Sequence, residues 1–411
     1  MAHEVLLWHR DGQRVWRTPA GGGLTLALAP GQSLDAALSA ALGPVWLLHD
    51  GGHLFGQSGL IQVQALEERH PTGGGGWSRD LPPPLPGTRP WQQPGWPDRA
   101  TRLADHLLRG AGRERQGPLR LHFASDLTAT HALETDQGPA WLKVSGTGQE
   151  ARLTTHLAAR HPGLLPPLLG ADPGQGALLS ADGGPLLDGV ADLGAWTGAL
   201  ARLGTFQRVA DPAALAALGA PALPLAQTVA RVDALLGDAA VLRGWGVDPA
   251  VAETLAAARP RIRAAYADLQ THGLPDQPAH GDAHPRNALH SVAHGAVWFD
   301  WSEAASAAHP FMDAGWFLAF ALHPGRAGLP VWQASGAADR LAAAYLHALG
   351  APEATPLLWR ALPLALLHRA AVYDETFRCW QGTVPGVRPN YVPYYLRLAA
   401  QSLGRLKAGT T

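Results

Sequence analysis

The stretch HGDAHPRN, from His280 to Asn287, places a carboxylate and an amide five positions apart, at Asp282 and Asn287. A second carboxylate, Asp300, follows Asn287 by thirteen positions, in the run VWFDW. Phosphoryl transfer needs such a set, because one carboxylate accepts or orients the proton of the attacking hydroxyl, while an amide oxygen and a second carboxylate hold Mg²⁺ against the phosphates. We therefore expect Asp282 to be catalytic, and Asn287 and Asp300 to be metal ligands.

A short hairpin is expected between Asn287 and Asp300. Residues 288–295 can form it, because residues 296–301 read as an apolar strand that ends on a carboxylate. The alternative is a helix cap and a loop whose polar residues have this spacing by chance. The agreement of three polar positions, their spacing and the intervening strand favours the chemical interpretation.

The pattern HGDxxxxN, followed by a hydrophobic strand and FDW, resembles the catalytic loop of the aminoglycoside phosphotransferase and choline kinase superfamily, small-molecule relatives of protein kinases. The resemblance covers about residues 95–400. It implies a two-lobed fold, Mg-ATP as the phosphoryl donor and a small-molecule hydroxyl as the acceptor. It also implies that His280 fixes the loop and that Asp313 braces it through backbone hydrogen bonds. Arg286 departs from the pattern, which commonly has a small residue or glycine there.

A lysine stands inside an apolar strand predicted at residues 140–144. Burying the charge of Lys143 is costly unless it is paired, and its nearest candidate partner is Glu150, at the start of a predicted helix. With the resemblance, these two residues correspond to the strand lysine and helix glutamate that orient the α- and β-phosphates in kinases. Alternatively, Lys143 lies at a strand edge and extends its ammonium to water.

Two further segments complete the nucleotide site that the resemblance implies. Residues 124–129 would cover the phosphates; they contain no glycine, so Ser125 and Thr128 would supply hydroxyls or backbone N–H groups. Residues 177–184 would form the hinge between the lobes, where backbone groups meet the adenine edge. The candidate cofactor-binding residues are therefore Lys143, Glu150, Ser180 and Asp182.

The composition limits the class of protein. The chain has 411 residues, enough for two or three domains, and 46% of them are hydrophobic, which supports a sizeable core. A net charge of −1 gives no case for a nucleic-acid or anionic-membrane partner. The single cysteine, Cys379, excludes an intrachain disulfide and fits a reducing cytoplasm, where we place the protein. The polar start and the lack of a long uncharged apolar run predict neither a signal peptide nor a transmembrane helix.

The chain divides into four segments of different character. Residues 1–80 read as an accessory module of short strands, in which Gly21–Gly23 is a turn rather than a phosphate-binding or Nudix-like loop. Residues 81–97 contain seven prolines and are expected to be a semi-rigid linker. Residues 98–182 are rich in predicted strands, and residues 183–411 in predicted helices. This order predicts an α+β fold with a sheet-containing N-lobe and a helical C-lobe.

The acceptor is expected to bind among the C-terminal helices. Asp374, Glu375, Trp380 and Gln381 cluster there, and acids beside an aromatic ring suit an amine or a polyol. A solvated helix face explains the same residues equally well. These side chains do not distinguish sugars, amino sugars, amino alcohols and aminoglycosides as acceptors, and nothing in the sequence sets the oligomeric state.

Three other interpretations fit the sequence less well. A zinc site at His284, His290 and His294 is disfavoured because the stretch contains no cysteine and turns between the histidines. A nucleotide-binding regulatory module, with residues 1–80 as its interaction surface, would have no use for a base at Asp282. A protein kinase would need a long activation segment or an APE-like element after Asp300, and the sequence has neither.

Overall fold

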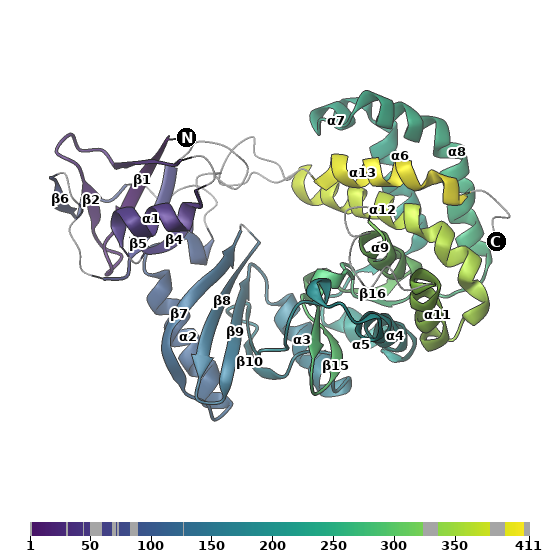
Figure 1. Cartoon of the computed structure of the whole chain (residues 1–411), viewed down its shortest axis with the longest axis horizontal. Coiled ribbons are helices and arrows are strands. Elements are labelled where there is room, and N and C mark those ends of the chain that lie inside the picture. Colours follow the sequence, from purple (N-terminus) through teal and green to yellow (C-terminus); the bar gives the residue numbers. More distant parts are fainter. Residues whose placement is uncertain are drawn as a thin grey trace. The chain divides into compact units, whose positions relative to one another are not determined.

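The computed structural model describes residues 2–29, 32–43, 45–49, 60–67, 71, 74–82, 89–125, 127–323, 336–378 and 391–406. They form two compact units (Figure 1). The first contains the described residues up to Gly146 together with Gly174–Ser180, and the second contains Thr147–Pro173 and the described residues from Ala181 onward. Within this part of the chain, no helix combines the length and the apolar character that a membrane span requires.

The N-terminal part of the first unit is a mixed sheet with one helix. The strand order is β4-β5-β1-β2-β6, with β3 also paired to β1, and β1 runs parallel to β5. Ser33 caps the helix, because its hydroxyl accepts the N–H of Ala36. The elements are β1 (Ala2–Trp8), β2 (Val15–Arg17), β3 (Leu24–Ala27), α1 (Leu34–Leu42), β4 (Val45–His49), β5 (Leu60–Ala65) and β6 (Gly76–Ser78).

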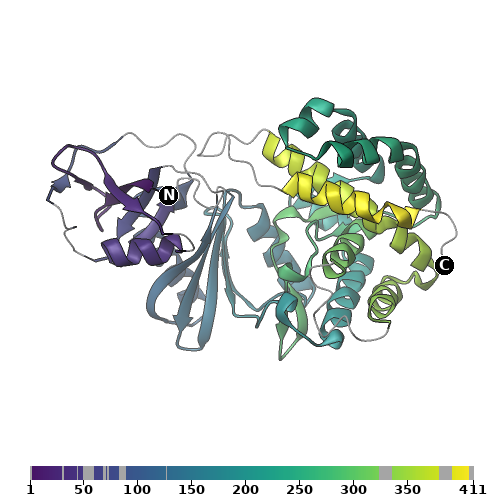
Figure 2. The same cartoon turned by 45° about the horizontal axis from the view of Figure 1, so that its top comes forward.

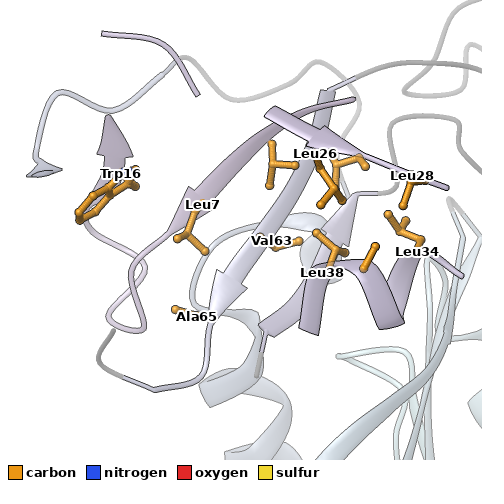
Figure 3. Close-up of a cluster of buried hydrophobic side chains, with 11 residues drawn as sticks. Leu7, Trp16, Leu26, Leu28, Leu34, Leu38, Val63 and Ala65 are labelled. Atoms are coloured by element: carbon orange, nitrogen blue, oxygen red, sulfur yellow. The ribbon is translucent and has the colours of Figure 1, made fainter. Parts of the chain in front are cut away.

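A small apolar core holds this sheet and α1 together (Figure 3). Leu7 and Val63 project from neighbouring strands, and Leu34 and Leu38 cover them from α1. Each of these side chains is less than a tenth exposed, and burying one stabilises the fold by about 1.5–3 kcal/mol. The first eighty residues therefore have a core of their own.

The remainder of the first unit is the sheet that carries Lys143. Its strands lie in the order β11-β9-β8-β7, and β8 is antiparallel to both β7 and β9. On β9, Leu142 and Val144 are buried, whereas Lys143 points to the opposite, partly exposed face. The elements are η2 (Pro90–Gln92), α2 (Trp96–Gly110), β7 (Arg115–Ala124), β8 (Thr128–Thr135), β9 (Gly138–Ser145) and β11 (Ala177–Ala181).

The described end of the proline-rich segment, residues 89–97, is packed rather than extended. Trp91 and Trp96 are 1% and 4% exposed. The indole N–H of Trp91 donates to the carbonyl of Ser125, at 2.6 Å, and so ties this segment to the turn between β7 and β8. Helix α2 begins at Trp96, because Pro97 has the fixed φ and missing N–H that suit a first helical turn.

Removing that indole N–H is expected to destabilise the first unit. Trp91→Phe keeps the buried ring but leaves the Ser125 carbonyl without this donor, so the free energy of unfolding should fall by about 1 kcal/mol. Thermal and urea unfolding measure the change. Trp359→Phe is the control, because the Trp359 indole makes no hydrogen bond within the described residues. An equal loss in both variants would contradict a role for this bond.

The second unit is mainly helical, and the strand-rich start followed by a helix-rich remainder confirms the predicted α+β class. Its elements are α3 (Gln149–Arg160), β10 (Leu168–Asp172), η3 (Leu187–Gly189), α4 (Leu193–Val209), α5 (Pro212–Ala217), β12 (Ala222–Leu223), α6 (Leu225–Gly237), α7 (Ala239–Gly244), α8 (Pro249–Thr271), β13 (Gln277–Ala279), η4 (Pro285–Asn287), β14 (Ala288–Ser291), β15 (Gly295–Trp298), η5 (Trp301–Glu303), β16 (Ala305–Ala308), α9 (Phe311–Ala321), α11 (Ala337–Leu349), η7 (Pro352–Ala354), α12 (Thr355–Arg378), α13 (Tyr391–Ser402) and η8 (Leu403–Leu406).

Helix α12 is central to this unit and packs against both α9 and α13 (Figures 1 and 2). Helix α9 is apolar on nearly all sides, as expected for a helix inside a core. Helices α9 and α12 approach closely at Gly315 of α9. An added Cβ there would lie 3.0 Å from the carbonyl oxygen of Ala361 and from the side chain of Ala365, both on α12. This close packing fixes the residues of α9 and α12 relative to each other.

Candidate active site

The loop from His280 to Asn287 starts where β13 ends. Strand β13 pairs antiparallel with β16, and β16 leads into α9, which carries Asp313 in its first turn. One carboxylate oxygen of Asp313 accepts the backbone N–H of His280 at 2.7 Å, and the other accepts that of Gly281 at 3.0 Å. The expected bracing of the loop by Asp313 is therefore confirmed.

His280 is fully buried and acts as a scaffold within the loop. Its Nε2 lies 2.9 Å from the carbonyl oxygen of Phe299, and its Nδ1 lies 3.4 Å from the backbone nitrogen of Asp282. Burial lowers the pKa of His280 to about 4, so the ring is neutral near pH 7. With Nε2 as the protonated nitrogen, the ring donates to Phe299 and accepts from Asp282, which joins the loop to the segment before Asp300.

The predicted hairpin is present as β14 and β15. Its register pairs Ala288 with Trp298, and the N–H of Phe299 donates to the carbonyl of Asn287 at 3.0 Å. Phe299, the residue just before Asp300, is therefore hydrogen-bonded to the backbone of Asn287. The φ of Asp300, 62°, is left-handed, the only such value at a non-glycine among the residues described, and a strain of about 1–2 kcal/mol accompanies it. Ser302 donates its hydroxyl to Asp300 Oδ1 at 2.7 Å.

The carboxylate of Asp282 has partners at both oxygens. Oδ1 accepts the indole N–H of Trp316 at 3.0 Å and lies 3.0 Å from a guanidinium nitrogen of Arg369. Oδ2 accepts the side-chain amide of Asn287 at 3.1 Å and lies 3.4 Å from Nε2 of His284. Burial alone would raise the pKa of Asp282, but the charges of Arg369 and His284 hold it far below its ordinary value. The carboxylate is therefore ionised near pH 7.

Arg369, on α12, is a residue of this site that the sequence analysis missed, as is Trp316 on α9. The Arg369 side chain is 1% exposed, and its NH1 donates to the carbonyl of Gly281 and to Oε2 of Glu303, each at 2.7 Å. Its guanidinium carbon lies 5.0 Å from the ring centre of Tyr373 and 5.8 Å from that of Trp316. The available signal was an arginine within the apolar run LPLALLHRAAVY, because a charge buried there must be paired.

The oxygen atoms near Asp282 suit a magnesium ion. The side-chain nitrogen of Asn287 donates to the backbone carbonyl and to the carboxylate of Asp282, at 3.0 and 3.1 Å. This orientation makes Oδ1 of Asn287 the atom that would face a cation. Oδ1 of Asn287 and the carboxylate of Asp300 are oxygen donors of the type that Mg²⁺ prefers, alongside phosphates and waters. The side chains therefore fit the predicted ion.

The candidate nucleotide-binding residues are divided between the two units. Lys143 lies opposite Thr130 in the sheet of the first unit, and Ser180 ends the first-unit part of β11. Glu150 is buried in the first turn of α3, and Asp182 is exposed just after β11; both belong to the second unit. The pairing of Lys143 with Glu150 and the joint role of the four residues stay predictions.

The acids expected at the acceptor site have other partners. Asp374 is buried and accepts the indole N–H of Trp245 at 2.7 Å. Glu375 forms an ion pair with Arg231 at 3.1 Å. The other two members of that predicted cluster, Trp380 and Gln381, lie outside the described residues. These contacts favour a structural role for the two acids over acceptor binding.

The pH dependence of activity should report on Asp313. Burial raises its pKa to about 6, although the N–H groups of His280 and Gly281 act in the opposite direction. Below that pH the carboxyl becomes protonated and loses the charge that strengthens both hydrogen bonds to the loop. We expect kcat/KM to fall as the pH is lowered through about 6. Asp282 cannot cause this decrease, because its own pKa is far lower.

Initial rates between about pH 5 and pH 8 test this expectation. Asp313→Asn is the matched variant, because it cannot titrate at this position. Any decrease that comes from protonation of a substrate phosphate appears in both proteins, so only the part absent from Asp313→Asn belongs to Asp313. Identical profile shapes in the two proteins would refute the assignment.

No protein-family model matches the chain, and no curated protein sequence matches it. Among solved structures, choline kinase LicA from Streptococcus pneumoniae is similar, with a TM-score of 0.50 and 13% identity over 75% of this chain and 98% of that one. A macrolide 2'-phosphotransferase, MphH, from Brachybacterium faecium gives a TM-score of 0.48 and 18% identity over 75% and 98% of the two chains. A choline/ethanolamine kinase family protein from Mesorhizobium loti gives 0.47 and 16%, over 75% and 100%.

At this level of identity, the similarity to the choline kinase establishes the fold. It spans almost the whole of that enzyme and three-quarters of this chain. The fold that the HGDxxxxN and FDW motifs imply is thus confirmed: the chain has the kinase-like α+β fold of that choline kinase.

Proposed function

We propose that this protein is a small-molecule kinase that transfers the γ-phosphoryl group of Mg-ATP to a hydroxyl of its acceptor. One observation carries the proposal. The ionised carboxylate of Asp282 stands on a loop that Asp313 holds at two consecutive backbone N–H groups, with the amide of Asn287 bonded to it. A loop built in this way keeps a carboxylate, an amide oxygen and the nearby Asp300 in fixed positions for one substrate.

In this function, Asp282 accepts a hydrogen bond from the acceptor hydroxyl and aligns its oxygen for attack. Its pKa is too low for it to take the proton early, which suits a loose transition state that asks mainly for positioning and charge neutralisation. Asn287 Oδ1 and the Asp300 carboxylate would hold Mg²⁺, which neutralises phosphate charge when bound. Lys143 and Glu150 would orient the inner phosphates, and the hinge segment from Ser180 to Asp182 would bind the adenine edge.

The fold supports a small acceptor. The similar enzyme from Streptococcus pneumoniae is named a choline kinase, so its acceptor is a small alcohol. In this chain, only ten residues separate Asp300 from the start of α9 at Phe311, and they are occupied by η5 and β16. A long segment that could present a protein substrate is absent between these two described elements. A small-molecule hydroxyl is therefore a better acceptor than a protein side chain.

Acceptor-dependent release of ADP tests the proposal. The full-length chain is incubated with Mg-ATP and a panel of sugars, polyols, amino sugars, amino alcohols and aminoglycosides, and each mixture is examined for a product heavier by one phosphoryl group. At least one acceptor should raise ADP release and acquire that mass, and EDTA should abolish both signals. Nucleotide binding without acceptor-dependent release would contradict the proposal and favour a regulatory nucleotide-binding module.

A further inference from the structure

Arg369 brings a buried positive charge directly to the candidate catalytic carboxylate. One guanidinium nitrogen lies 3.0 Å from Oδ1 of Asp282 and 3.2 Å from Oε1 of Glu303, and the other donates to Oε2 of Glu303 and to the carbonyl of Gly281. Both carboxylates are thus paired with a group that belongs to the protein. An ammonium group on an acceptor would have to compete with this internal cation for the same oxygens.

The faces of the aromatic rings beside Asp282 are also occupied by the guanidinium of Arg369. The guanidinium of Arg369 lies over the rings of Tyr373 and Trp316, and the face of an aromatic ring is where a ligand cation would bind. Tyr395 packs edge-on against Trp316, with ring centres 5.0 Å apart, and lies 5.5 Å from Tyr373. The three rings therefore surround a cation that the chain itself supplies.

The position of the attacking hydroxyl places the acceptor near this charge. The hydroxyl must lie within hydrogen-bonding distance of Asp282, about 2.6–3.2 Å. A cationic group one or two carbons away would then find the nearest carboxylate oxygens and ring faces already occupied by the guanidinium of Arg369. An anionic group finds no advantage there either, because Gly281, Glu303 and Asp282 already take up the nitrogens NH1 and NH2.

We propose that Arg369 determines acceptor specificity: it excludes cationic acceptors such as amino alcohols and leaves an uncharged polyol or sugar as the substrate. This inference rests on the proposed phosphotransferase function. The carboxylate of Glu303, whose side chain is 37% exposed, is accessible to accept hydrogen bonds from further hydroxyls of such a molecule. The rings of Trp316 and Tyr373 give the same region an apolar surface against which the carbon skeleton can pack.

Two measurements on the full-length chain test the inference. Rates of ADP release are compared for glycerol, xylitol and ribose against choline and ethanolamine, and binding of choline is measured separately by calorimetry. We expect turnover with an uncharged acceptor, no turnover with the two cations and no detectable binding of choline. In Arg369→Gln, choline binding should become measurable, because the carboxylates of Asp282 and Glu303 and the nearby ring faces are then free of the guanidinium.

Arg360→Gln is the matched control, because Arg360 lies on the same helix but pairs with Asp268 at 3.1 Å, away from Asp282. The Arg360→Gln variant should bind choline no more detectably than the wild type does. Arg369→Lys keeps the charge and should still exclude choline, so it carries the test if Arg369→Gln does not fold by circular dichroism.

The outcomes separate the two proposals. Turnover of choline or ethanolamine, or binding of choline to the wild type, overturns the specificity inference and leaves the phosphotransferase intact. If no acceptor releases ADP, the phosphotransferase proposal fails, and calorimetry still decides whether the site admits a cation. Equal choline binding by Arg369→Gln and Arg360→Gln would show that Arg369 does not exclude cations.

Discussion

Asp282→Asn is expected to lower turnover by about 10²–10⁴-fold, the loss typical of a positioned acid–base group. Asparagine has the same shape, so its oxygen can still accept the indole N–H of Trp316, and Arg369 keeps its ion pair with Glu303. What is lost is the charge that orients the acceptor hydroxyl, together with the ion pair to Arg369 and the oxygen that accepts the amide of Asn287. Steady-state rates with the acceptor found in the panel, together with calorimetric binding of ATP, measure the effect. Nucleotide affinity should remain close to that of the wild type.

Asp268→Asn is the control for this variant. Asp268 also pairs with an arginine, Arg360 at 3.1 Å, but its side chain is 49% exposed, and such surface pairs contribute little. The turnover of Asp268→Asn should be close to that of the wild type. If Asp282→Asn retained more than about a tenth of wild-type turnover, Asp282 would lose its proposed role.

Gly281→Ala is expected to disrupt the catalytic loop and to abolish activity. Gly281 has a φ of +85°, and an added Cβ would lie 2.0 Å from the carbonyl oxygen of Glu303. The loop cannot move aside easily, because Asp313 binds the N–H of Gly281 and Arg369 binds its carbonyl. The free energy of unfolding should therefore fall by about 4 kcal/mol or more, in the exceptional range for a single substitution.

Gly273→Ala is the control that separates the effect of this steric overlap from the effect of backbone strain alone. Gly273 also has a positive φ, of +70°, but no atom lies within 4 Å of an added Cβ. Gly273→Ala should cost only the strain, about 1–2 kcal/mol, and should keep its activity. Urea unfolding of both variants gives the two values. A similar loss at the two positions would refute the close packing of Gly281 against Glu303.

The parts of the site that depend on neighbouring sequence could be predicted. Asp282 and Asn287 are five residues apart on one loop, and the hairpin that follows connects Asn287 to Asp300 through bonds between adjacent strands. Alternation of apolar residues likewise predicted the strand that carries Lys143, and helical periodicity predicted α4 at residues 193–209. Local spacing is sufficient for such features, because side chains repeat every two residues in a strand and about every 3.6 residues in a helix.

The parts that depend on distant contacts could not be predicted in the same way. Trp316 and Arg369 reach Asp282 from α9 and α12, and nothing in the spacing of either residue points to that carboxylate. The partners of the acids expected at the acceptor site depend on distant contacts as well. Asp374 and Glu375 read as a polar cluster, but helix packing turned them toward Trp245 and Arg231.

The ion pair between Asp282 and Arg369 has a consequence for biosynthesis. The ribosome completes the loop well before it reaches α12, so the emerging chain carries Asp282, Glu303 and Asp313 without the cation that neutralises them. Contacts between distant positions form late, since a long loop must first close. The nascent polypeptide therefore completes the charged cluster around Asp282 only after α12 has left the ribosome, and a chain released earlier lacks both ion pairs of Arg369.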